Sequence, residues 1–76
     1  MTARKGAYSA SLRNQAKESL EQALRCAKSG ERARAQEALD AAMRALGGLE
    51  YLHGPESTAW ASGAVDSIAQ AMRRTA

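Results

Sequence analysis

The side chains that most often act as nucleophile and base in enzymes, a thiol and an imidazole, occur once each in this chain, as Cys26 and His53. A catalytic nucleophile needs a base and an orienting group that converge on it, and no neighbour in the sequence supplies them. Cys26 also falls near the C-terminal end of a predicted helix, where negative partial charge disfavours a thiolate. We therefore interpret Cys26 as a small apolar residue and His53 as a helix-end residue, and expect no enzymatic activity.

Metal and cofactor sites are not expected either. A structural zinc site takes four Cys or His ligands, whereas this chain has two such residues in all. With a single cysteine, no intrachain disulfide can form. The pair Gly47-Gly48 does not fit a phosphate-binding loop, because no predicted strand precedes it and no Lys-Ser or Lys-Thr follows.

Basic residues gather on one flank of the first predicted helix, where Arg13, Lys17 and Lys28 recur at helical spacing. The net charge of the chain is only +3, and acidic residues, Glu21 among them, are interleaved with this flank. Arg13, Lys17 and Lys28 are therefore candidate nucleic-acid contacts for an alternative function, in which they would neutralise phosphates.

The aromatic residues Tyr51 and Trp60 flank the dipeptide Gly54-Pro55 and fall outside the apolar stripes of their helices. One interpretation is that the two rings stack on each other and close that end of the domain. The other is that they form an apolar anchor at a protein interface, where Trp and Tyr often supply binding energy. We take Tyr51 and Trp60 as the candidate protein-interface residues.

Three helices are predicted to position these side chains, over about residues 9–29, 31–53 and 55–74. Residues 1–8 are interpreted as a flexible N-terminal arm, which leaves 9–76 as a single helical domain. Ser29-Gly30 and Gly54-Pro55 separate the helices, because glycine favours a helix C-terminus and proline the first position of the next helix. We expect the second helix to continue through Gly47-Gly48; the alternative is that it ends at Gly47.

The predicted fold is an all-α three-helix bundle, in which a long antiparallel helical hairpin is completed by a third helix. The short Ser29-Gly30 connection makes the first two helices antiparallel neighbours. Alanine dominates the apolar stripes and phenylalanine is absent, so that each contact in the core removes little apolar area from water. A small domain with such a thin core is expected to associate with a second copy or with another protein.

The turn between the first two helices resembles half of a tetratricopeptide motif, with Gly30 in the turn and Ala35, Leu39 and Ala42 after it. The Trp, Leu-Gly and Tyr positions that precede the turn in that family are missing. The resemblance implies a helical hairpin and carries no functional residue.

No run of about 18 apolar residues exists, and no apolar region follows Arg4-Lys5, so we expect neither a membrane span nor a secretory signal. A single cysteine fits a reducing compartment, and a cytoplasmic location is expected.

The predicted function is a small non-catalytic protein–protein interaction module, such as an adaptor, co-chaperone or inhibitor-type regulator, which forms homo-oligomers or binds another protein through a helical surface. The alternative is a nucleic-acid-binding accessory or regulatory protein.

Overall fold

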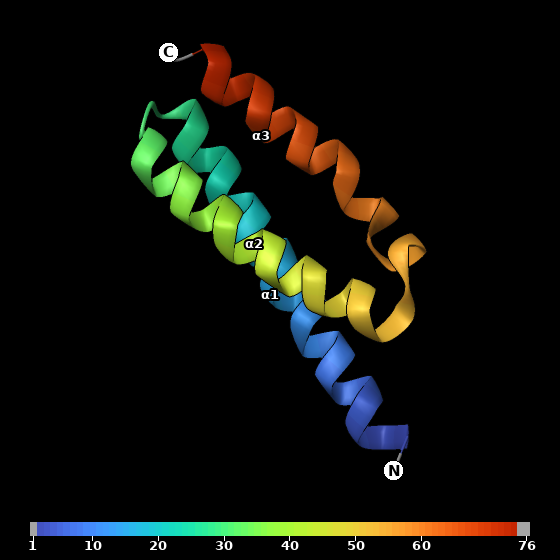
Figure 1. Ribbon diagram of the computed structural model, residues 1–76. Coiled ribbons are helices and arrows are strands. Elements are labelled where there is room, and N and C mark those ends of the chain that lie inside the picture. The colour runs from blue at the N-terminus through green and yellow to red at the C-terminus, as the bar shows by residue number, and fades with distance from the viewer. Residues whose placement is uncertain (1, 75–76) are drawn as a thin grey trace.

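Three α-helices and one 3₁₀ segment make up residues 2–74, which are the residues that this computed structural model describes. The elements are α1 (Thr2–Lys28), α2 (Arg32–His53), η1 (Pro55–Ala61) and α3 (Ser62–Arg74). Figure 1 shows α1 and α2 as antiparallel neighbours, with α3 running beside them in the direction of α1. The predicted all-α three-helix bundle with a long antiparallel hairpin is confirmed.

Helix α1 begins at Thr2 rather than near Ser9, so the segment interpreted as a flexible arm is helical from its second residue. No proline interrupts residues 2–8, and the cost of Gly6, about 1 kcal/mol relative to alanine, is not enough to end the helix. Ser9 therefore lies inside α1 and does not cap its N-terminus. The Ser9 hydroxyl instead forms a hydrogen bond with Nε2 of His53, the last residue of α2. Met1 lies outside the described residues.

The turn between α1 and α2 is built on Gly30, whose φ of +80° lies in the left-handed region that favours glycine. The amide of Gly30 donates to the carbonyl of Ala27 at 3.2 Å, and the amide of Glu31 donates to the carbonyl of Cys26 at 2.9 Å. These two bonds form a Schellman motif, which satisfies carbonyls left open at the end of α1. As predicted, the short turn makes α2 an antiparallel neighbour of α1.

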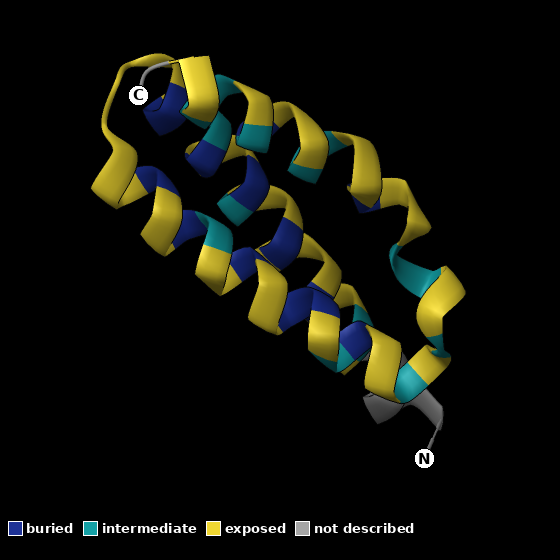
Figure 2. Cartoon of the chain, turned by 45° about the horizontal axis from the view of Figure 1, so that its top comes forward, coloured by how far each residue is buried: buried dark blue, intermediate teal, exposed yellow. Residues whose placement is uncertain are grey.

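The core lies mainly between α1 and α2, where buried residues of the two helices face each other (Figure 2). Eight of the fourteen apolar side chains that are buried among the described residues are alanines, so the helices pack closely while each contact removes little apolar area. The largest of the fully buried side chains is Ile68, which α3 contributes. A separate small cluster near the turn joins Cys26, Ala27 and Ala35 with Met72 of α3.

Helix α2 continues through Gly47-Gly48, as expected, but the two glycines have different surroundings. A Cβ atom at Gly48 would lie 3.2 Å from Cδ1 of Leu12, so glycine allows α1 to approach α2 at this point. A Cβ atom at Gly47 would meet nothing within 4 Å. Packing within the described chain therefore accounts for Gly48 and gives no reason for Gly47.

Residues 55–61 form a 3₁₀ helix, whereas the sequence predicted one continuous α-helix over 55–74. In this segment and the residue after it, four side chains donate to the carbonyl three residues earlier; these bonds are Ser57 to Gly54, Thr58 to Pro55, Trp60 to Ser57 and Ser62 to Ala59. Such local bonds compete with the α-helical pattern. They explain a 3₁₀ run that is longer than the usual three or four residues.

The third helix packs mainly against α1 and contacts α2 much less. This placement leaves a shallow groove along each side of α3, one toward α1 and one toward α2. None of the helices within residues 2–74 has a stretch that is long and apolar enough to cross a membrane.

The different surroundings of the two glycines lead to a stability prediction. Gly47→Ala should raise the free energy of unfolding by about 0.5–1 kcal/mol, because alanine is the better helix former and its methyl group points into open space. Gly48→Ala should raise the free energy of unfolding clearly less than Gly47→Ala does, or should lower it, because the Leu12 side chain must shift. Urea denaturation followed by circular dichroism measures both, and equal effects would contradict the close α1–α2 approach at Gly48.

Candidate functional site

A groove of about 190 Å³ runs between α1 and the η1–α3 segment, and we call it the α1–α3 groove. Its floor is apolar and comes from both sides, with Leu20 and Leu24 on α1 and Ala64 and Ile68 on α3. Trp60 closes one end of it. The groove exists because α3 packs on α1 around Ile68, while Leu24, at the edge of that contact, stays only half-buried.

The groove extends past Leu24 into a second hollow of about 430 Å³ near the α1–α2 turn. Lys28 of α1 and Arg74 of α3 line this hollow together with Gln70 and Ala71. Leu24 lines both parts, so the groove and the second hollow adjoin each other, and we call the two together the strip along the α1–α3 edge. Chemically, this strip is an apolar surface that carries polar and charged side chains along its length.

Trp60 is held in place by its own backbone segment. Its Nε1 donates a hydrogen bond of 2.8 Å to the carbonyl of Ser57, within the 3₁₀ turn. The side chain is 41% exposed, so more than half of it is covered. A tryptophan whose N–H is satisfied and whose ring is partly open has the properties of an interface anchor.

The predicted basic flank borders this strip. Arg13, Lys17 and Lys28 are all exposed on α1, and their sequence spacing places them within about 60° of one another around the helix. Lys17 lines the groove beside Trp60, and Lys28 lines the hollow beside Arg74. The structure thus brings the basic flank and Trp60, which sequence reasoning treated as separate candidates, to one surface.

Tyr51 does not belong to this surface. It follows the buried residue Leu49 by two positions, which turns it about 200° away, to the outer side of α2. Its exposed fraction of 90% leaves no room for a ring stacked on it, so the interpretation that Tyr51 and Trp60 stack on each other is wrong.

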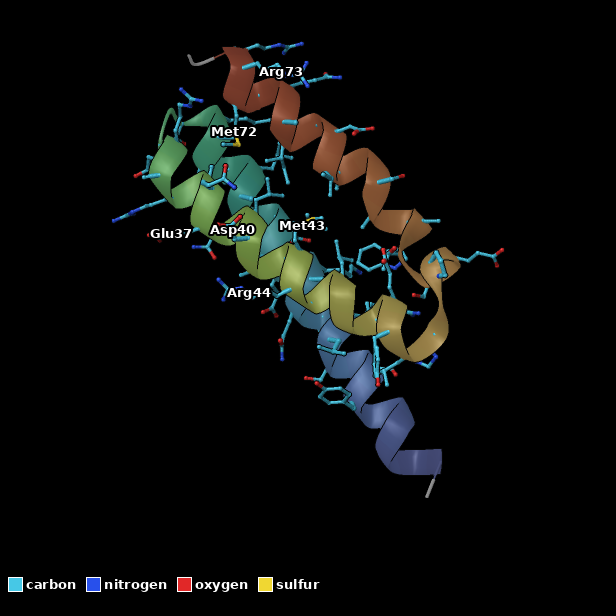
Figure 3. The ribbon with its side chains drawn as sticks, viewed as in Figure 1. Glu37, Asp40, Met43, Arg44, Met72 and Arg73 are labelled. Atoms are coloured by element: carbon cyan, nitrogen blue, oxygen red, sulfur yellow. The ribbon has the colours of Figure 1, made fainter. Side chains whose placement is uncertain are left out.

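An exposed stripe on α2 includes Tyr51. Met43, Gly47 and Tyr51 follow one another at four-residue steps, which places them on one side of the helix, within about 80° of one another. Met43 is 50% exposed and points toward the side on which α3 lies, whereas the neighbouring Glu37 and Arg44 point away from α3 (Figure 3). We call Met43, Gly47 and Tyr51 the α2 stripe.

The thiol and the imidazole do not converge. Cys26 is buried beside Ala35 at the beginning of α2, and His53 is exposed at its other end, about 27 Å away at 1.5 Å per residue. In the described part of the chain, no group of three His, Cys, Asp or Glu side chains is arranged to hold a metal ion.

Sequence reasoning missed three residues of these surfaces. Leu24 follows the apolar spacing of α1 and gave no sign of exposure, but its position at the edge of the buried side leaves it partly open to the groove. Arg74 was predicted only as the end of the third helix. Met43 was not singled out, although a large apolar residue outside the stripe of alanines and leucines is a usable signal of an exposed apolar site.

No protein-family model, curated protein or solved structure matches this chain.

Because Tyr51 and Trp60 are buried to different extents, we expect their replacement by alanine to affect the free energy of unfolding differently. Tyr51→Ala should change the free energy of unfolding by less than about 0.5 kcal/mol, because almost nothing covers the ring. Trp60→Ala should lower it by about 2 kcal/mol, because the covered part of the indole packs in the groove. Thermal and urea unfolding test this; a large loss for Tyr51→Ala would contradict its position on the outer side of α2.

Proposed function

We propose that this chain is a small non-catalytic protein–protein interaction module of the cytoplasm, an adaptor, co-chaperone or inhibitor-type regulator, that binds through the α1–α3 groove. The observation that carries the proposal is the apolar floor of the groove, where the half-buried Leu24 and Ala64 lie over the buried Ile68 and which ends at the partly open ring of Trp60. A groove between two helices is a common binding site for a third helix that presents an apolar face.

The character of the strip supports a protein as the partner. Apolar residues form its floor, and the charged side chains Lys17, Glu21, Lys28 and Arg74 stand along it. An apolar centre with an aromatic anchor and a polar rim is the usual anatomy of a protein interface. Association with a second copy is part of the proposal, because a core made largely of alanine gains stability from further burial.

The experiment that tests this proposal compares the intact chain with charge-reversed variants as bait for binding partners. Lys17→Glu/Lys28→Glu should lose the partners that the wild type retains, because both reversals lie on the rim of the strip. Arg32→Glu/Arg34→Glu is the matched control, since it changes the net charge equally at exposed α2 positions that do not line the strip. Circular dichroism must give the same helicity for all three proteins. Equal retention of partners by both double variants would contradict the proposal.

A second candidate function, nucleic-acid binding, is favoured by one observation. Arg74 of α3 adds a fourth cation to the surface that Arg13, Lys17 and Lys28 form on α1. The apolar floor between these cations favours a protein partner instead, because phosphate contacts need no such floor.

Titration of duplex DNA and RNA at low and at physiological salt separates the two functions. We expect weak binding that disappears at physiological salt, since a few exposed cations give only a salt-sensitive, nonspecific interaction. Sub-micromolar binding that survives physiological salt and is lost in Lys17→Glu/Lys28→Glu would favour nucleic acid over protein.

A further inference from the structure

We propose that the occupant of the α1–α3 groove is the α2 stripe of a second copy of this chain, which seats Met43, Gly47 and Tyr51 against Leu24 and Trp60. The inference rests on the proposed function, because it names the partner of the same groove. Three observations carry it: the charges of the two surfaces, the spacing of those charges, and the glycine in the middle of the stripe.

The two surfaces carry opposite charge. Beside the α2 stripe stand three acidic residues and one basic residue, a net charge of −2; these are Glu37, Asp40, Glu50 and Arg44. The groove and its extension carry three basic residues and one acidic residue, a net charge of +2; these are Lys17, Lys28, Arg74 and Glu21. Two exposed surfaces of opposite sign on one chain attract each other between copies.

The charges also match in position when α2 of one copy runs antiparallel to α1 of the next. Asp40 and Glu50 are ten residues apart, about 15 Å along a helix, and Lys17 and Lys28 are eleven apart, about 16 Å. Asp40 then lies opposite the pair Lys28 and Arg74, and Glu50 opposite Lys17. Gln36 donates to one oxygen of Asp40 at 2.9 Å and Thr58 to one oxygen of Glu50 at 2.8 Å, and each carboxylate has a second oxygen.

In the same orientation Tyr51 of one copy comes to the Trp60 end of the neighbour's groove, because Tyr51 directly follows Glu50. The two rings, which lie on different faces of one molecule, meet between molecules. Their contact covers Tyr51, the most exposed of the large apolar side chains in the described chain, together with the open part of Trp60. Paired aromatic rings are typical of energetically dominant interface contacts.

Gly47 gives the third observation. A glycine inside a helix costs about 1 kcal/mol relative to alanine, and a methyl group added at this position would meet nothing within 4 Å that accounts for the glycine. Gly47 lies midway between the exposed Met43 and Tyr51. A second helix can therefore approach α2 closely at the centre of the stripe, which in this register lies opposite Leu20 and Glu21 of the neighbouring groove, while Met43 lies opposite Leu24.

The contact is heterologous, because the stripe and the groove are different surfaces of the same molecule. Each copy that binds through its stripe still presents an open groove, and the association repeats. The chain should therefore form a series of species that grow with concentration, rather than a closed two-fold dimer.

Trp60 is the only tryptophan of the chain, so its fluorescence reports directly on the groove. As the concentration of the wild type rises, the fluorescence emission of Trp60 should shift to shorter wavelength, and light scattering should give masses that pass beyond a dimer.

Lys17→Glu/Lys28→Glu and Asp40→Lys/Glu50→Lys should each weaken association at least about tenfold. Gly47→Gln should also weaken association, because the glutamine side chain extends from the stripe into the space that the second copy would occupy. The helicity should be kept, since a Cβ atom at Gly47 meets nothing within 4 Å in its own chain. Arg32→Glu/Arg34→Glu is the control and should associate like the wild type.

Mixing the two charge-reversed variants is the decisive measurement. The first keeps a native stripe and the second a native groove, so their mixture should regain the association that each lacks alone. A wild type that stays monomeric with a constant Trp60 emission would overturn the inference. So would a stable dimer that is insensitive to Asp40→Lys/Glu50→Lys, or a mixture that shows no recovery.

These outcomes separate the inference from the proposed function. A monomeric wild type that captures another protein, and loses it in Lys17→Glu/Lys28→Glu, overturns the second-copy inference and supports the groove as a docking site. Association that is unaffected by Lys17→Glu/Lys28→Glu, together with unchanged partner capture, overturns both.

Discussion

The close approach of α1 and α2 is the constraint on which the rest of this structure depends. Alanines line the contact, and Gly48 lets the Leu12 side chain reach the backbone of α2. Helices that meet through such small side chains leave little apolar surface between them for a third helix to cover. Helix α3 therefore gains most of its burial from single larger residues such as Ile68, and it lies against one helix of the hairpin more than against both. The open strip along the α1–α3 edge follows from that placement.

Much of the fold follows from residue patterns, because those patterns act over short distances. The stripe of alanines and leucines identifies the buried side of each long helix, and Gly30 marks the turn through its left-handed conformation. Gly48 did not break α2 because the periodicity of the apolar residues continues past it. Two local features differ from the sequence predictions. Residues 1–8 were interpreted as a flexible arm, but α1 begins at Thr2, since a single glycine, Gly6, without a proline does not end a helix. The run of Ser, Thr and Trp after Pro55 contained the signal for 3₁₀ geometry, since each of these side chains donates to the carbonyl three residues back.

The candidate site was less accessible from sequence than the fold. Lys17 and Trp60 were each singled out, but forty-three residues separate them in the chain, and only the lean of α3 toward α1 brings them to one groove. Tyr51 and Trp60 are close in sequence and lie on different faces, because the 3₁₀ segment and its hydrogen bonds direct the indole toward α1. Proximity in sequence was therefore a poor guide to proximity in space. The crossing of the helices decides which residues share a surface, and no local pattern encodes that crossing.

The bonding within η1 has a consequence for how the molecule opens. A 3₁₀ turn has poorer hydrogen-bond geometry than an α-helix, and part of this one is held by exposed hydroxyl groups. Because α1 and α2 contact each other far more than either contacts the segment from Pro55 onward, that segment would be the first to separate while the α1–α2 hairpin stays folded. Backbone amides of α3 would then exchange with solvent through a sub-global opening, at a lower free energy than amides at the alanine contact. Such an opening would divide the chain into two units of unequal stability, with the groove along the boundary between them.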